Sequence, residues 1–440
     1  MPGDRKQAKL ILFVTANGHH LAAWRHPSVP RDAGHSFAHF KDIAQRAEAA
    51  ALDAIFFADV AAFHLPRETP EAAEYGARAG HFEPITLLSA LSAVTTRVGL
   101  ICTASTTYNE PYHIARKFAS LDHLSSGRAG WNLVTSANPN EAANFGKEHH
   151  LDHDKRYRRA GEFIDVVTGL WDSWADDAFL RDKDTGRQLD PTKLHVLNHV
   201  GSDFRVRGPL NIARSPQGYP VRVQAGSSDD GQELAARTAD VVFTAQRTLQ
   251  GAQAFYRSVK SRLARHGRRE QDLLVLPGIV PIVGRSQAEA EAHLSELQQL
   301  IHPRAGLAFL SSLLGGVDLS KYDVDGPVPE VPLTDGSRGR QALVLDAARR
   351  DGLSLRQTYL RFAGGRGHLQ VVGTAQTIAD VIEEWLDHEA ADGFNLMPAV
   401  LPGGLEDFAE LVLPELRRRG RFRSGYEGDT LRENLGLPRP

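Results

Sequence analysis

Short apolar runs alternate along the whole chain with longer stretches in which apolar residues recur at helical spacing. This alternation favours a parallel α/β fold. The runs number about eight, which is what a closed (β/α)8 barrel needs. The candidate strands are Leu10–Thr15, Ala54–Val60, Val98–Thr103, Ala129–Thr135, Val221–Ala225, Val241–Thr244, Leu273–Val283 and Gly393–Val400.

Two local patterns predict helices between these runs. Ser286 and Glu289 form a capping-box pair ahead of a helix over 290–300. Farther along, Ile378, Val381, Ile382 and Trp385 follow the i, i+3, i+4, i+7 spacing of a helix that faces a core. The segment HLQVVG, from position 368, is ambiguous and could be an additional strand.

A plain barrel takes about 250 residues, so roughly 190 of this chain remain for insertions. Three segments lack clean periodicity and are rich in Gly, Pro, Asp and Arg: residues 61–82, 175–220 and 302–373. Long loops in a compact domain are usually functional lids or disordered segments. We therefore expect one barrel domain over 1–440, with long insertions in the loops at its C-terminal face.

Composition is that of an ordinary globular protein, with 42% apolar and 24% charged residues. The net charge of −3 gives no sign of nucleic-acid binding, and the basic run RRRGRFRS, residues 417–424, is interpreted as a solvated or subunit-contact surface. The one cysteine, Cys102, lies in an apolar run, which is typical of an inert core thiol. No targeting segment or membrane span is evident, so we expect a cytoplasmic protein.

The segment QAGSSDDGQELAARTAD, residues 224–240, offers what a phosphate needs. Gly226, Ser227 and Ser228 lie between an apolar run and a helix, and so supply backbone N–H groups, hydroxyls and a helix N-terminus. Asp229 and Asp230 weigh against this, because carboxylates also favour helix N-termini and would repel a phosphate. The alternative is a plain helix cap.

A second candidate site is SGRAGWNLVTSANPNEAANFG, residues 126–146, a strand that opens into a polar loop. His153 and Tyr157 follow, and share one face of a helix if that helix begins early enough. Hydrogen-bonding side chains at a strand end, next to His and Tyr, suit a planar ligand with polar edges. An ordinary strand–loop–helix is the alternative.

Several motifs of other enzyme classes are missing from the sequence. Nineteen histidines invite a metal site, yet there is no H-E-x-x-H or Cys-rich spacing, and we predict no metal. There is also no G-x-G-x-x-G after a strand, no G-K-[ST] and no G-x-S-x-G. Tightly held dinucleotides, nucleotide hydrolysis and serine acyl transfer are disfavoured accordingly.

These stretches resemble the flavin-dependent monooxygenases of the bacterial-luciferase-like superfamily, in the branch of nitrilotriacetate and dibenzothiophene-sulfone monooxygenases. Other segments resemble that branch in the same order: ILFVTANGHHLAAWRHP, FFADV, TASTTYNEPYHIARKFASLDHLSSGRAGWN, RGPLNIARSPQGYPVRVQAGSSDDG and GFNLMPAVLPGGLEDF. They span nearly the whole chain.

The resemblance implies roles for individual residues. Ser227 and Ser228 would contact the phosphate of FMN, and the flavin would be held by Asp59, Thr106, Asn132, His153 and Tyr157. His19 and His20 would approach it from the substrate side, as weak candidates for catalysis. From the residues alone, Asp59 could equally form a turn, Thr106 could bond backbone at a strand end, and the histidine pair could lie on the surface.

The resemblance also implies a reaction. A separate NAD(P)H:flavin reductase would supply FMNH2, and the barrel would use it with O2 to oxygenate a small organic N- or S-containing substrate. It further implies a homo-oligomer, a dimer or tetramer. The alternatives are an F420- or nicotinamide-dependent oxidoreductase of the same barrel class and a non-catalytic flavin-binding protein.

Overall fold

The computed structural model describes residues 5–63, 74–76, 80–136, 138–331, 338–365 and 367–440. Over these residues, eight parallel strands form a closed ring, in the order β9-β11-β1-β2-β3-β4-β7-β8 and back to β9. They are β1 (Lys9–Val14), β2 (Ala54–Phe57), β3 (Gly99–Ser105), β4 (Ala129–Val134), β7 (Val221–Gln224), β8 (Val241–Thr244), β9 (Leu274–Val283) and β11 (Gly393–Leu396). The predicted (β/α)8 barrel is confirmed. Each strand overlaps its predicted run, although β1 begins one residue earlier than predicted and β3 ends two residues later.

The ambiguous segment after position 368 is a further strand, β10 (Leu369–Gly373). It pairs in parallel with the second half of β9, from Ile279 to Val283. The first half of β9 pairs with β8, and only Gly278 and Ile279 pair with β11. β9 is therefore long enough to close the barrel and still carry β10 beyond the ring.

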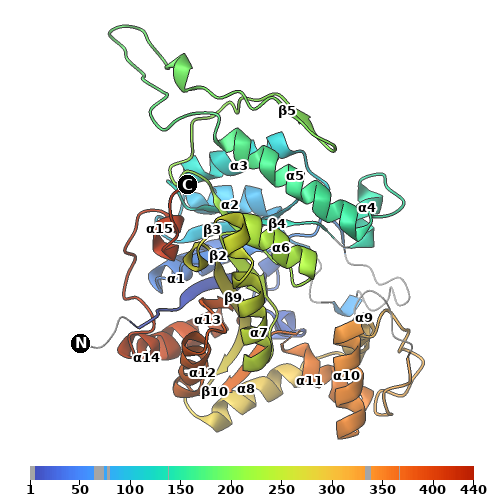
Figure 1. Ribbon diagram of the computed structural model, residues 1–440. Helices are drawn as coiled ribbons and strands as arrows, with labels where there is room; N and C mark the ends of the chain where they lie inside the picture. The colour runs from blue at the N-terminus through green and yellow to red at the C-terminus, as the bar shows by residue number, and fades with distance from the viewer. Residues whose placement is uncertain (1–4, 64–73, 77–79, 137, 332–337, 366) are drawn as a thin grey trace.

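Helices surround the barrel (Figure 1). They are α1 (Phe37–Ala49), α2 (Pro84–Ser92), α3 (Pro111–Leu124), α4 (Pro139–Asn144), α5 (His153–Trp171), α6 (Asp229–Thr238), α7 (Leu249–Lys260), α8 (Gln287–Gln299), α9 (Pro303–Leu313), α10 (Arg338–Asp351), α11 (Leu355–Ala363), α12 (Ala375–Asp387), α13 (Gly403–Asp407), α14 (Leu413–Arg418) and α15 (Leu431–Leu435). No helix within the described ranges is long and apolar enough to cross a membrane.

Local sequence explains where two of these helices begin and pack. Ser286 caps α8 by accepting from the Glu289 amide at 3.1 Å, as predicted, but the Glu289 carboxylate bonds the Arg285 amide instead of completing the capping box. In α12, Ile378, Ile382 and Trp385 are buried, which confirms the predicted core-facing stripe.

Strand residues alternate between two cores, as side chains on successive positions point to opposite faces. Trp131 and Leu133 of β4 pack outward against Phe118 and Phe163 of the helices. Residues of the other parity, among them Phe13 and Phe56, fill the inside of the barrel. Cys102 is buried in the outer core, and this burial raises the pKa of its thiol well above the ordinary value, as an inert thiol requires.

The three predicted insertions differ in structure. Much of 61–82 lies outside the described residues. Residues 175–220 contain an extended arm with the antiparallel pair β5 (His199–Val200) and β6 (Arg205–Val206), at the top of Figure 1. Residues 302–373, which showed no clean periodicity, contain α9, α10 and α11, seen in orange beyond α8. The prediction that this segment is a long loop is therefore wrong for the residues of these three helices.

Three aspartates stand just before strands, at the N-terminal end of the barrel. Asp53, Asp240 and Asp392 directly precede β2, β8 and β11. The carboxylate of each accepts a hydrogen bond from the backbone amide of the second residue of an adjacent strand, at 2.7–2.8 Å. Cations pair with all three: Arg423 with Asp53 at 3.0 Å, Arg432 with Asp240 at 2.9 Å and Lys260 with Asp392 at 3.1 Å. These aspartates tie neighbouring strands together where the barrel begins.

The C-terminal segment closes the same end of the barrel. Leu431 and Leu435 of α15 pack with the inner core. Arg421 and Arg423 of the basic run are buried, and Arg421 pairs with Glu383 at 2.9 Å. The interpretation of this run as a solvated surface is therefore wrong for these two side chains, whose acidic partners are distant in the sequence.

Candidate functional site

The residues predicted to hold a ligand lie at the C-terminal mouth of the barrel, where barrel enzymes place their sites. Asp59 follows β2, Thr106 follows β3, Asn132 lies in β4, and Ser227 and Ser228 follow β7. His153 and Tyr157 occupy the first turns of α5, the helix after β4 and α4. His19 and His20 follow β1.

The structure brings Tyr157, His153 and Ser228 together between α5 and α6. The Ser228 hydroxyl lies 3.4 Å from the Tyr157 hydroxyl, and the rings of His153 and Tyr157 are 4.7 Å apart. Ser228 also caps α6, because its Oγ accepts from the Gly231 amide at 3.1 Å. The Ser228 side chain thus caps α6, which was the alternative interpretation. It also lies next to Tyr157, another of the residues predicted to hold a ligand.

Two glycines allow the backbone and the two hydroxyls to approach one another closely at this point. A Cβ on Gly226 would lie 3.1 Å from the Gly231 Cα, and a Cβ on Gly231 would lie 3.2 Å from the Tyr157 hydroxyl. Any larger residue at either position would press on the backbone or on the Tyr157–Ser228 pair. The α6 N-terminus therefore lies beside two hydroxyls, a combination of backbone amides and hydroxyls that suits a phosphate group.

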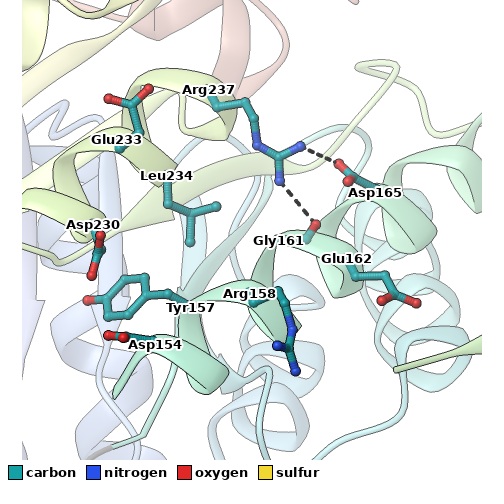
Figure 2. A pocket seen from close by; sticks show the side chains of 10 residues that line it. All are labelled: Asp154, Tyr157, Arg158, Gly161, Glu162, Asp165, Asp230, Glu233, Leu234 and Arg237. Atoms are coloured by element: carbon teal, nitrogen blue, oxygen red, sulfur yellow. Dashed lines mark hydrogen bonds and ion pairs between the residues drawn. The ribbon is translucent and has the colours of Figure 1, made fainter. Parts of the chain in front are cut away.

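Carboxylates border the same place. Asp229 turns away and pairs with Arg262, whereas Asp230 faces the site, 3.3 Å from His153 Nδ1. Figure 2 shows Asp154, Tyr157 and Asp230 together at one end of an open groove of about 580 Å³ between α5 and α6. The objection that carboxylates would repel a phosphate here therefore applies to Asp230 and not to Asp229.

Inside the barrel, two asparagines carry acceptors without hydrogen-bond partners among the described residues. Asn132 donates to Thr103 Oγ1 at 2.7 Å, which leaves its Oδ1 buried and unpaired. Asn395 in β11 is also buried and its Oδ1 is likewise unpaired. Buried polar atoms without partners are costly. The two Oδ1 atoms could therefore accept from a ligand that supplies N–H donors.

The remaining predicted residues already have protein partners. Thr106 donates from its hydroxyl to Val134 O at 3.1 Å, which is the strand-end alternative. Asp59 lies 3.2 Å from His81. His19 and His20 are buried, with His19 Nε2 at 2.8 Å from Phe13 O, so the surface-pair alternative is wrong.

A hydrogen-bond network that the sequence did not reveal joins the loops after β2, β3 and β4. Ser136 lies 2.8 Å from the Ser105 hydroxyl and donates to Glu141 at 3.2 Å. Glu141 also accepts the Ala61 amide at 3.2 Å, and Arg156 donates to the Ser136 carbonyl. Ser136 has a φ of 51°, a backbone conformation that non-glycine residues rarely adopt. Strained residues of this kind cluster at functional sites.

An aromatic cluster lines the barrel interior below the mouth on the side of β1, β2 and β8. Phe13 contacts Phe56 at 4.7 Å, Phe243 at 5.5 Å and His19 at 4.6 Å, measured between ring centroids. His368, just before β10, stacks on Phe243 at 5.2 Å with nearly parallel planes. The mouth thus combines polar groups over β4, β7 and β11 with an apolar floor.

These features and the fold define a class of protein. Residues 16–390 match the model of the luciferase-like monooxygenase family, and the chain belongs to that family. Its members are flavin-dependent enzymes that use O2. The family identified by resemblance is confirmed, and the chain is a monooxygenase-family oxidoreductase.

Individual relatives are similar over their full length. The chain is 50% identical to N-acetyl-S-(2-succino)cysteine monooxygenase of Bacillus subtilis (strain 168), over 100% of this chain and 99% of that protein. It is 49% identical to nitrilotriacetate monooxygenase component A of Aminobacter aminovorans, over 100% and 98%. The crystal structure of DmoA from Hyphomicrobium sulfonivorans matches with a TM-score of 0.89 at 32% identity, over 98% of this chain and 92% of that one.

Proposed function

We propose that this chain is the oxygenase component of a two-component flavin monooxygenase. It takes FMNH2 from a separate NAD(P)H:flavin reductase and uses O2 to oxygenate a small organic N- or S-containing compound. The observation that carries the proposal is the meeting of the Ser228 and Tyr157 hydroxyls at the N-terminus of α6, where Gly226 and Gly231 allow close approach. A relative at 49% identity is itself called component A, which supports a partner component.

The residues fit FMN in two separate ways. Ser227, Ser228 and the α6 amides would hold the phosphate, with His153 and Tyr157 beside it. The unpaired Oδ1 atoms of Asn132 and Asn395 match the N–H groups at the edge of a reduced flavin ring. Thr106 and Asp59 would border the ring through the loops after β3 and β2.

When bound, the flavin supplies the oxygen chemistry, and the overall change is FMNH2, O2 and substrate to FMN, water and the oxygenated product. The protein supplies position and a dry site. Phe13, Phe56 and Phe243 give the barrel an apolar interior under the mouth. His19 and His20 follow β1 beside that interior and would meet the substrate there. We also infer a dimer or tetramer, which light scattering would measure.

A reductase-coupled screen tests the proposal. Purified protein should be nearly colourless and should bind FMNH2 more tightly than oxidised FMN. Nitrogen and sulfur compounds, incubated with FMNH2 and air and followed by mass spectrometry, should include one that gains oxygen or is cleaved. F420H2 and NADH should neither bind nor replace FMNH2. Yellow flavin that survives dialysis would contradict the proposal, as would FMN binding with no product from any compound.

A double-mutant cycle tests the site itself. His153→Ala and Tyr157→Phe should each weaken FMNH2 binding, and their effects should not add, because both touch one ligand. Wild-type affinity in both variants, with circular dichroism unchanged, would exclude a flavin site at the start of α5. Arg265→Ala, at an exposed arginine beyond the far end of α7, is the control and should leave affinity unchanged.

A further inference from the structure

Arg247 lies at the barrel mouth, three residues after the end of β8. Its guanidinium carbon is 5.1 Å from the ring centroid of Phe362, a buried residue of α11. This contact joins the mouth to the helical insertion α9–α11. Arg247 is exposed, and a guanidinium that lies over a ring face keeps its N–H groups available to a ligand.

Charge around Arg247 is unbalanced. Neighbouring Arg361 has its own partner, Asp351. Arg247 has no ion pair or hydrogen bond with any other residue in the described parts of the chain. Partial desolvation and the like charge of Arg361 both lower the pKa of Arg247. A guanidinium held beside another cation, with no carboxylate of its own, is stabilised if a ligand brings negative charge.

The surroundings of Arg247 suit a small molecule. Phe243 lies four residues earlier, in β8, and its ring contacts Phe13, Phe56 and His368. Ligand sites combine such apolar walls with a few placed polar groups that fix orientation. Here the apolar floor lies inside the barrel, and the Arg247 guanidinium stands at the rim, in the loop that follows β8.

We propose that Arg247 binds a carboxylate of the substrate, so that the enzyme acts on carboxylated amines or sulfides. This assignment rests on the proposed monooxygenase function and deepens it. Phe362 holds the guanidinium at the rim, and the carboxylate in turn directs the nitrogen or sulfur of the substrate into the barrel. Arginine is suited to this role because its planar fork matches a carboxylate in two hydrogen bonds.

Matched substrates test the charge requirement. The probes are thiodiacetate and nitrilotriacetate, each compared with its uncharged amide in the FMNH2-coupled assay. The wild type should prefer the acids. Arg247→Ala and Arg247→Gln should raise KM for the acids by about tenfold to a hundredfold, the loss of one charged hydrogen-bonding group. KM for the amides and the affinity for FMNH2 should stay unchanged, and Arg265→Ala should behave as the wild type.

A binding measurement separates this inference from the proposed function. Propane-1,2,3-tricarboxylate has no nitrogen or sulfur to oxidise, so its binding by calorimetry needs no turnover. The wild type should bind it, and Arg247→Gln should bind it at least tenfold more weakly. Equal binding by both would overturn the role of Arg247 even if oxygenation is found. Loss of FMNH2 binding in Arg247→Gln would also overturn this role, because it would show that Arg247 binds the flavin and not the substrate. Tricarboxylate binding that needs Arg247, without turnover of any compound, would count against the oxygenase and leave the carboxylate site supported.

Discussion

Removing the carboxylate of Glu162 should release the β5–β6 hairpin from α5. Four groups donate to this side chain. One is in β5, His199 Nε2 at 3.0 Å, and three are in the turn after it: Ser202 Oγ at 2.8 Å and the amides of Asp203 and Phe204 at 3.0 and 2.9 Å. A hydrogen bond to a charged group contributes about 1.5–3 kcal/mol where it is shielded from water. The hairpin lies at the surface, so we expect Glu162→Ala to cost about 2–4 kcal/mol in local opening and Glu162→Gln about half of that.

The same bonds fix the pH dependence of the hairpin. Burial raises the pKa of Glu162, but the bonds from His199, Ser202 and the two amides outweigh it and bring this pKa to about 2, below the usual 4.5. Because the folded pKa lies below the unfolded one, the stabilisation is complete above pH 4.5. It is lost as the pH falls from 4.5 towards 2.

Hydrogen exchange measures this directly at the amides of Asp203 and Phe204. In Glu162→Ala, their protection should fall about 30-fold or more, the equivalent of 2 kcal/mol. In the wild type, it should fall below pH 4.5 after correction for intrinsic exchange. Glu148→Ala, at an exposed glutamate, is the matched control. Unchanged protection in Glu162→Ala, with the barrel intact by circular dichroism, would refute the anchoring role.

Three further predictions concern the site and the barrel. Ser228→Ala should weaken FMN binding by about 1–2 kcal/mol and leave riboflavin binding nearly unchanged; equal losses in fluorescence titrations would mean that Ser228 only supports α6. Burial raises the pKa of Asp122 to about 6 against hydrogen bonds that lower it. The wild type should therefore lose stability as the pH rises from about 4 to about 6, and Asp122→Asn should lack that loss in urea unfolding; parallel profiles would contradict this. Arg423→Leu should cost about 3–5 kcal/mol, since Asp53 stays buried without its cation; a loss under about 1 kcal/mol by denaturation would show that the pair is dispensable.

The barrel was predictable because each of its strands is a short apolar run, buried on both faces, and such runs survive in the sequence whatever the loops contain. The helices α9–α11 were not predicted. These helices pack on their own small apolar cluster, around Leu310 and Tyr359. The glycines and arginines in this segment interrupt the helical spacing of its apolar residues. The buried Arg421 and Arg423 were missed for another reason: their acidic partners lie far away in the sequence, and only the fold pairs them.

The sequence predicted where the candidate site residues lie, at the mouth of the barrel, better than it predicted their hydrogen bonds. In a parallel barrel, a polar residue that follows an apolar run lies at the mouth. This rule identified Ser228 from its own segment, although its neighbour Tyr157 lies 71 residues earlier in the sequence. Asn395 was missed although the signal existed, as a lone amide inside the apolar run of β11. Glu141 gave no local signal, because its partners Ala61 and Ser136 come from two different loops, and only the fold brings these together.

The aspartates before β2, β8 and β11 have a consequence for how such a barrel changes over time. They tie strands together at the end opposite to the mouth, so substitutions among the mouth loops leave these ion pairs in place. Effects at well-separated positions are nearly additive. The free energy of unfolding that these ion pairs contribute can therefore offset the loss of stability caused by new side chains at the mouth, including arginines without a partner in the protein. The two ends of the molecule are in this sense free to evolve at different rates, one towards new substrates and the other hardly at all.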